Sequence, residues 1–172
     1  MLKMKERLQD PEFCVRRAKL ADTQALERLL RRSWLTTFAP HLPDAAVDRF
    51  AAEDPVRTYV RAMWNQFSVA DEAGEVVGMY HVHGNLVAAI HVDPDCKGRG
   101  VGTRLMDAAE SEIASRFDEA RLEVLAFNRS AQCFYSHRGW SERRRFYGSE
   151  CGSPVELVEM RLTPARSNGK GR

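Results

Sequence analysis

The stretch HVDPDCKGRGVGTRL, residues 91–105, has glycines at alternate positions between an apolar run and a segment with helical spacing. A glycine-rich turn between a strand and a helix commonly holds a phosphate, because backbone N–H groups and the positive end of the helix dipole face the anion. Gly98, Gly100 and Gly102 therefore predict an anion site at which a ligand touches the main chain.

Two nucleotide-binding motifs fit this segment poorly. A P-loop ends in Gly-Lys followed by Ser or Thr, whereas Gly102 is followed by Thr103 and Arg104. A dinucleotide-binding fingerprint needs G-x-G-x-x-G within a βαβ unit, whereas this segment reads G-x-G-x-G after an antiparallel meander. The anion therefore belongs to a different class of ligand.

Hydrophobic periodicity around the segment predicts strands and helices in mixed order. The expected elements are a strand at 13–18, helices at 23–34, 43–50 and 55–67, three strands within 67–94, a helix at 101–113, a strand at 120–127, a helix at 130–138, and strands at 141–148 and 155–162. This order predicts an α/β (α+β) fold whose central sheet of six to seven strands is mixed, mostly antiparallel and flanked by helices.

The bulk composition favours a single globular domain. The chain has 172 residues, 44% of them hydrophobic, which suits a single core over 13–162. We expect 1–12 to be an N-terminal extension and 163–172, which has basic residues and no acidic ones, to be a disordered basic tail. Without that tail the net charge is close to zero, which disfavours nucleic-acid binding.

The remaining bulk features concern location and metals. No apolar run reaches the roughly 18 residues of a membrane span, and the start lacks a signal-peptide core, so we expect a cytoplasmic protein without a membrane partner. The four cysteines are scattered without a CxxC pair, which argues against zinc and disulfides. We expect no metal.

Two motifs resemble those of one known family. CKGRGVG, residues 96–102, resembles motif A of the GNAT superfamily of acetyl-CoA-dependent N-acetyltransferases, with lysine in place of the first Arg or Gln. NRSAQCFYSHRGW, residues 128–140, resembles motif B, with its asparagine after a strand and its Phe-Tyr pair in a short helix. The resemblance implies a GNAT fold over 13–162, acetyl-CoA as cosubstrate, and an amine acceptor as the second partner.

The resemblance also assigns the cofactor site. It places the pantetheine arm and thioester beside the fourth strand and the pyrophosphate on the glycine segment. The residues implied are Ile90, His91 and Val92 for the arm, Lys97, Gly98, Arg99, Gly100, Val101, Gly102 and Thr103 for the pyrophosphate, and Asn128 as the motif B asparagine.

The implied reaction is attack of an amine on a thioester carbonyl. The strand N–H of Val92 is expected to meet the oxyanion, and Tyr135 matches the tyrosine that protonates the departing thiolate. An ammonium group with a pKa of about 10.4 also has to lose a proton to a base. Some relatives carry a glutamate where Leu86 stands, and others carry one five residues before the motif B asparagine, where this chain has Glu123.

Hairpin geometry offers a second candidate base. With a two-residue turn at Gly84-Asn85, His83 pairs with Leu86 and His81 pairs with Ala88. His91 then pairs with Gly78 and faces the other way, which excludes a three-histidine metal site. His83 and Glu123 both stay open as the base.

The acceptor site is expected between residues 31–43 and a loop at 146–156. Its candidate lining residues are Trp34, Phe38, His41 and Phe146. The expected function is N-acetyl transfer from acetyl-CoA to a primary amine, on a small molecule, a peptide N-terminus or a lysine, by direct attack in a ternary complex. The alternative is a non-catalytic acetyl-CoA-binding sensor or assembly module, and the resemblance also suggests a homodimer formed by the last strands.

Overall fold

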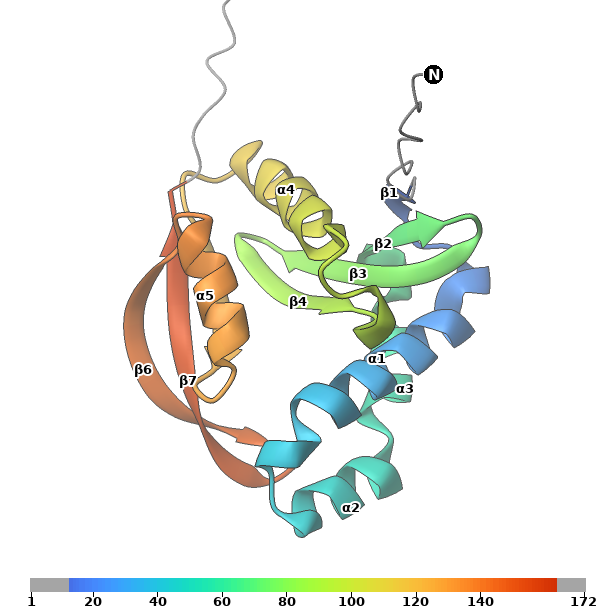
Figure 1. Ribbon diagram of the computed structural model, residues 1–172, viewed down its shortest axis with the longest axis vertical. Coiled ribbons are helices and arrows are strands. Elements are labelled where there is room, and N and C mark those ends of the chain that lie inside the picture. The colour runs from blue at the N-terminus through green and yellow to red at the C-terminus, as the bar shows by residue number, and fades with distance from the viewer. Residues whose placement is uncertain (1–12, 164–172) are drawn as a thin grey trace, which may run out of the picture.

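The computed structural model describes residues 13–163 and contains a seven-stranded sheet in the order β1-β2-β3-β4-β5-β7-β6 (Figure 1). Neighbouring strands are antiparallel except β4 and β5, which are parallel. The prediction of a mixed, mostly antiparallel sheet flanked by helices is confirmed. The extension expected at 1–12 and nearly all of the tail expected at 163–172 lie outside the described residues.

The expected succession of elements is present. The strands are β1 Phe13–Arg17, β2 Phe67–Glu72, β3 Glu75–His83, β4 Leu86–Val92, β5 Ala120–Leu125, β6 Ser141–Glu150 and β7 Ser153–Leu162. The helices are α1 Thr23–Thr37, α2 Asp44–Glu53, α3 Pro55–Met63, α4 Val101–Ala114 and α5 Arg129–His137. The helix expected at 55–67 is shorter, because a 3₁₀ turn over Trp64–Gln66 leads into β2.

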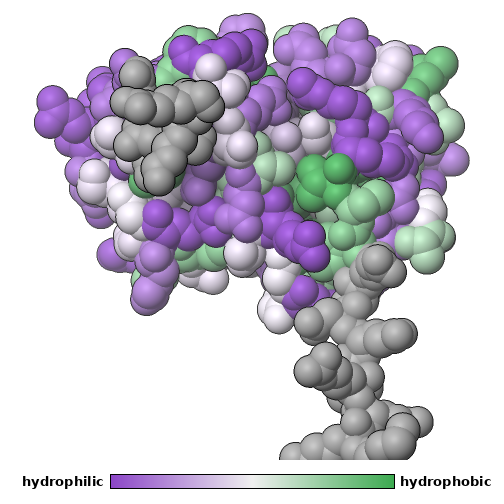
Figure 2. Space-filling view, turned by 90° about the horizontal axis from the view of Figure 1, so that it is seen from above, coloured by the Kyte–Doolittle hydropathy of each residue, from purple (hydrophilic) through white to green (hydrophobic). Residues whose placement is uncertain are grey.

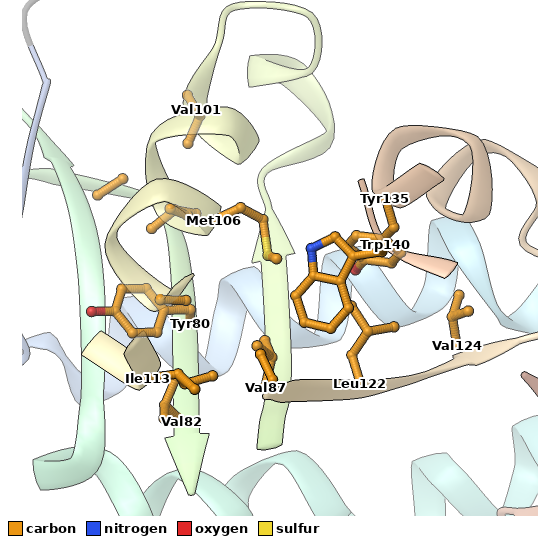
Figure 3. Packing of buried hydrophobic residues seen from close by; sticks show 14 of the residues in the cluster. Tyr80, Val82, Val87, Val101, Met106, Ile113, Leu122, Val124, Tyr135 and Trp140 are labelled. Atoms are coloured by element: carbon orange, nitrogen blue, oxygen red, sulfur yellow. The ribbon is translucent and has the colours of Figure 1, made fainter. Parts of the chain in front are cut away.

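The sheet separates two hydrophobic clusters. On one face α4 and α5 pack on the strands, with Met106 between Val101 and Val87, and Trp140 beside Leu122 (Figures 1 and 3). On the other face α1, α2 and α3 supply a second cluster, which includes the fully buried Leu26, Val60 and Phe67. Outside these clusters the surface seen in Figure 2 is mainly hydrophilic, with apolar side chains gathered in small areas.

The first turn of α4 lies close to β3 because Gly78 has no side chain. A Cβ at Gly78 would lie 2.8 Å from Leu105 Cδ1, 3.0 Å from Val101 Cγ1 and 3.1 Å from the carbonyl oxygen of His91. Any other residue here would force these side chains, or the helix, to shift. Gly78 thereby keeps the N-terminus of α4 beside the end of β4.

A gap opens between the two parallel strands. The pairing of β4 with β5 is limited to Leu86 with Arg121 and Val87 with Leu122, although both strands continue. Beyond this point the facing edge of β4 has no strand partner. The end of β4 is therefore accessible from the side, between the two helix layers.

A β-bulge at Ala88 changes the register expected for the hairpin. His83 does pair with Leu86, but His81 pairs with Ala89 and His91 pairs with Met79. The expected pairs of His81 with Ala88 and of His91 with Gly78 are therefore wrong, because one extra residue in β4 reverses every later side chain. The side chain of His91 lies on the same face as those of His81 and His83.

The segment expected as a substrate loop at 146–156 is mostly strand. β6 runs to Glu150 and β7 begins at Ser153, so that only Cys151 and Gly152 form the turn. Their φ angles of 47° and 77° fit a tight hairpin turn whose two central residues are left-handed. Phe146 consequently lies within a strand, and Glu150 is held at a defined register position.

Candidate functional site

The glycine segment forms a main-chain donor site at the start of α4. Gly98 and Gly100 have φ angles of 76° and 82°, which favour glycine. Gly100 is the N-cap, and its carbonyl oxygen accepts from Arg104 N at 3.1 Å. Three N–H groups lie in the first turn, between the N-cap and Arg104, and have no acceptor within the helix. They belong to Val101, Gly102 and Thr103. Together with the helix dipole they suit an anion.

These donors open into a cavity of about 560 Å³ between β4 and α5, here called the β4–α5 cavity. It is lined by Ser33, Thr37, Phe38, Ile90, His91, Val92, Cys96, Lys97, Gly98, Gly100, Gly102, Thr103, Asn128, Ser130, Ala131, Phe134 and Tyr135. The structure thus brings together most of the residues expected at the cofactor and places Tyr135 with them.

Two of the expected cofactor residues direct their side chains elsewhere. The Arg99 guanidinium forms an ion pair with Glu72 at the end of β2 and donates to Cys96 Sγ at 3.3 Å. The side chain of Val101 is 1% exposed and belongs to the core (Figure 3), so only its N–H faces the donor site. Asn128 caps α5 by accepting from Ala131 N at 3.2 Å.

A second cavity of about 370 Å³ occupies the gap between the strands and is called the β4–β5 cavity. Glu123, Tyr135 and Glu150 line it, together with the bulge at Ala88. Tyr135 and Ile90 line the β4–α5 cavity as well. Tyr135 and Ile90 therefore stand at the border between the two cavities.

A third cavity of about 520 Å³ lies on the face covered by α1 and α3 and is called the α1–α3 cavity. Its lining consists of Leu30, Trp34, Phe38, Val56, Tyr59, Met63, His81, His83, Leu86, Ala88, Ala89, His91 and Glu150. Phe38 and His91 line all three cavities. The three spaces meet at these two side chains.

Tyr135 has the protonation state of an acid. It is 7% exposed, it lies with its ring centroid 6.2 Å from that of Trp140, and burial raises the pKa of its phenol to about 12 (Figure 3). The hydroxyl group therefore keeps its proton at neutral pH. The resemblance to motif B predicts this tyrosine as the acid, and the fold places it between two cavities.

The two candidate bases occupy different cavities. Glu123 is exposed on β5 and lines the β4–β5 cavity with Tyr135. His83 is exposed at the end of β3 and lines the α1–α3 cavity instead. Glu123 thus shares a cavity with the candidate acid, whereas His83 does not.

The four candidate acceptor residues do not form one group. Trp34 and Phe38 line the α1–α3 cavity. His41 stacks on Phe127 with ring centroids 4.4 Å apart and lines a separate cavity of about 400 Å³. Phe146 lies beneath the Arg144 guanidinium at 4.8 Å and is not among the residues that line the β4–α5, β4–β5 or α1–α3 cavity.

Sequence reasoning missed Tyr59 and did not predict the contacts that His81 and Glu150 make in the α1–α3 cavity. Tyr59 and His81 come from α3 and β3, and Tyr59 Oη lies 2.7 Å from His81 Nδ1. Glu150 comes from the end of β6, where its Oε1 accepts from Trp34 Nε1 at 2.7 Å. Because these partners are distant in sequence, no local pattern marked them.

Both the sequence and the fold of this chain resemble those of known proteins. The family model described as acetyltransferase (GNAT) domain matches residues 63–142, which include β3, β4, α4, β5 and α5. A search of curated protein sequences gave no significant match. Many solved structures, in contrast, share the fold.

Three of these structures show the extent of the similarity. A GCN5-related N-acetyltransferase from Rhodopseudomonas palustris has a TM-score of 0.76 at 21% identity, covering 91% of this chain and 99% of that one. Apo YjaB from Escherichia coli has a TM-score of 0.63 at 25% identity, covering 90% and 99%. PaiA N-acetyltransferase from Thermoplasma acidophilum, solved with coenzyme A, has a TM-score of 0.64 at 16% identity, covering 86% and 98%.

The glycine segment, the gap beside β4 and these matches define an acyltransferase fold. Residues 63–142 match the GNAT acetyltransferase domain, and the described chain has the fold of GNAT acetyltransferases. Within residues 13–163 no helix is long and apolar enough to cross a membrane. The same residues contain no group of three or more His, Cys, Asp or Glu side chains arranged for a metal ion.

His91 generates a prediction on stability. Its Nδ1 lies 2.9 Å from Ser33 Oγ, and burial lowers its pKa from 6.5 to about 4. The unfolded chain therefore binds the proton more tightly, and the stability that neutral His91 contributes is lost as the pH falls from 6.5 towards 4. Between pH 7 and 4.5 we expect this residue alone to cost about 2 kcal/mol.

Urea unfolding of the wild type and of His91→Asn at these two pH values measures the effect. Asparagine retains a partner for Ser33 but does not titrate, so the variant should lose less stability on acidification. The acidic side chains and His81 titrate in both proteins. Their contributions to the pH dependence of stability therefore cancel when the two proteins are compared. An identical pH dependence in the two proteins contradicts the assignment.

Proposed function

We propose that the protein transfers the acetyl group of acetyl-CoA to a primary amine by direct attack in a ternary complex. The observation that supports this is that Tyr135 lines both the cavity at the start of α4 and the cavity in the gap beside β4. When bound, acetyl-CoA supplies a thioester with an electrophilic carbonyl. The residues present fit such a molecule, because its pyrophosphate needs the donors and its narrow arm needs a slot along a strand.

Different residues are proposed to bind different parts of acetyl-CoA. The N–H groups of Val101, Gly102 and Thr103 bind the pyrophosphate, and the Lys97 ammonium adds positive charge at the mouth. Ile90, His91 and Val92 line the path of the arm. Arg99 is not needed in this scheme, because its guanidinium is held by Glu72.

The N–H of Val92 is proposed to stabilise the charge on the carbonyl oxygen. Asp93 N donates to Val77 O at 2.9 Å, so the Asp93 N–H points towards β3. N–H directions alternate along a strand, and the Val92 N–H therefore points into the unpaired gap between β4 and β5. A donor held in this way is worth about 2.7–4 kcal/mol of transition-state stabilisation.

The proposed proton transfers balance the reaction. A base first takes one proton from the ammonium group to give the free amine. As the amine nitrogen bonds to the carbonyl carbon it releases a second proton, and as the C–S bond breaks Tyr135 donates a proton to sulfur and is then reprotonated from solvent. Glu123 is the preferred base because it lines the same cavity as Tyr135. His83 is the second candidate, from the α1–α3 cavity.

Gly102→Val tests the cofactor site without straining the backbone. Gly102 lies in the helix, and a Cβ there would meet Val92 Cγ2 at 3.6 Å and Phe134 Cζ at 3.9 Å, which are ordinary contacts. The two valine methyl groups would extend into the β4–α5 cavity. We expect the variant to fold and to lose the rise in Tm that CoA causes in the wild type.

Thermal unfolding with and without CoA and acetyl-CoA measures this effect. Ser111→Val, at an exposed position on the same helix, is the control and should keep the full shift. An unchanged CoA affinity in Gly102→Val argues against the site. A wild type that binds acetyl-CoA but releases no CoA with any amine supports the sensor alternative instead.

Tyr135→Phe tests the proposed acid. Phenylalanine keeps the packing against Trp140 but has no proton to donate. We expect kcat to fall by about 10²–10³-fold while the KM for acetyl-CoA changes little. Release of the CoA thiol, followed with a chromogenic disulfide, gives both constants, and a kcat within a factor of three of the wild type removes Tyr135 from the mechanism.

The base is tested by comparing Glu123→Gln with His83→Gln. The variant that removes the base should have a kcat about 10²-fold lower than that of the wild type. Its rate should also no longer fall at low pH, because the group whose protonation causes that fall is absent. The other variant should retain a profile like that of the wild type. If both retain it, neither residue removes the proton.

A further inference from the structure

The α1–α3 cavity has a chemical character that the proposed transfer reaction leaves unused. Most of its walls are apolar side chains from α1, α3 and β4. They include Leu30, Val56, Met63, Leu86, Ala88 and Ala89. At about 520 Å³ it has the size of a pocket for a small organic molecule.

Glu150 is the one carboxylate among the residues that line this cavity, and no Lys or Arg lines it. Its Oε1 accepts from Trp34 Nε1 at 2.7 Å, and the Trp34 ring stacks on Phe50 with centroids 3.7 Å apart. The indole therefore fixes the carboxylate in place. Among the described residues, Oε2 has no hydrogen-bond donor.

The other polar groups of the cavity do not neutralise this charge. Burial lowers the pKa of His91 to about 4 and also lowers that of His81, so both are neutral at pH 7. His81 is occupied by Tyr59 at 2.7 Å and Gln66 at 3.3 Å. His83 lies at the exposed rim. The cavity thus combines one fixed negative charge with an apolar interior.

The charge lies at the entrance to the reaction site. Glu150 lines both the α1–α3 cavity and the β4–β5 cavity, and the latter also contains Tyr135 and Glu123. A cationic group held by Glu150 is therefore next to the gap beside β4. The apolar body attached to it would extend in the opposite direction, towards α3.

We propose that the acceptor is a small primary amine on one apolar body, of the arylalkyl or branched alkyl class, whose ammonium group is bound by Glu150. This inference rests on the proposed acetyl transfer and specifies its substrate. A polyamine that entered the α1–α3 cavity would place its further charges against apolar walls, because no carboxylate other than Glu150 lines this cavity. A peptide would bring main-chain groups that these walls leave unpaired.

Binding to the CoA-loaded protein tests the inference directly. The probes are 2-phenylethylamine, isoamylamine, the uncharged analogue 2-phenylethanol, spermidine and an Ala-Ala-Ala peptide, titrated by calorimetry at pH 7.5. We expect the first two to bind at least tenfold more tightly than the other three and to be acetylated. Tighter binding of spermidine or of the peptide overturns the assignment, as does no binding of either apolar amine.

Glu150→Gln should weaken binding of 2-phenylethylamine and raise its KM at least tenfold, with an unchanged Tm shift by CoA. Glu156→Gln is the matched control, because Glu156 on β7 lines the separate 400 Å³ cavity with Arg145 and should have no effect. Equal affinity of the amine for the wild type and Glu150→Gln overturns the role of Glu150.

A second variant covers the case in which Glu150→Gln does not fold. Met63→Trp fills the apolar end of the α1–α3 cavity and leaves Glu150 unchanged. We expect it to weaken binding of 2-phenylethylamine and to leave CoA binding intact. Unchanged amine affinity in this variant contradicts the proposed cavity. Failure of the wild type to bind CoA would instead refute the proposed function, so the two failures are distinguishable.

Discussion

The loss of pairing between β4 and β5 after Val87 and Leu122 is the constraint on which the site depends. A strand edge inside a sheet leaves N–H and C=O groups that need partners. Here the gap is bordered by the first turn of α4 and by α5, both of which approach the end of β4. The same opening therefore provides main-chain donors, a slot and access to Tyr135, and it would be closed if the two strands paired along their full lengths.

The bulge at Ala88 determines on which face of the sheet the later side chains of β4 lie, beside the gap. Before the bulge, Val87 packs in the cluster beneath α4, whereas after it Ala89 packs in the cluster beneath α1 and α3. The reversal brings the side chain of His91 to the point where the three cavities meet. Without the extra residue, His91 would point towards α4 and an apolar side chain would stand at that junction.

Much of the fold was predictable because its signals are local. Alternating valines marked β2 to β4, helical spacing marked α4, and the glycines at 98 and 100 need left-handed φ angles that few other residues adopt. The bulge has no such signal, since Leu86 to Val92 reads as an uninterrupted strand. The segment at 146–156 looked like a loop because of its Gly, Ser and Pro residues, yet a turn of two left-handed residues lets both strands continue.

The two halves of the site also differ in how much the sequence reveals. The cofactor half consists largely of main-chain groups in one continuous stretch, and a motif describes it. The proposed acceptor half consists of side chains from α1, α3, β3 and β6, whose proximity arises only in the folded chain. Trp34 and Glu150 are 116 residues apart and form one hydrogen bond of 2.7 Å. No local pattern at either position predicts the other.

That hydrogen bond also explains how a carboxylate is retained among apolar side chains. A charged group partly removed from water is destabilising unless it is paired or hydrogen-bonded. The Trp34 indole satisfies one oxygen of Glu150 and cannot change its position, because it is 5% exposed and stacked on Phe50. The second oxygen has no donor among the described residues, so a bound cation would complete the pairing of the carboxylate. The fold thus holds a partly exposed carboxylate that lines both the α1–α3 and the β4–β5 cavity, at the point where the proposed acceptor would enter.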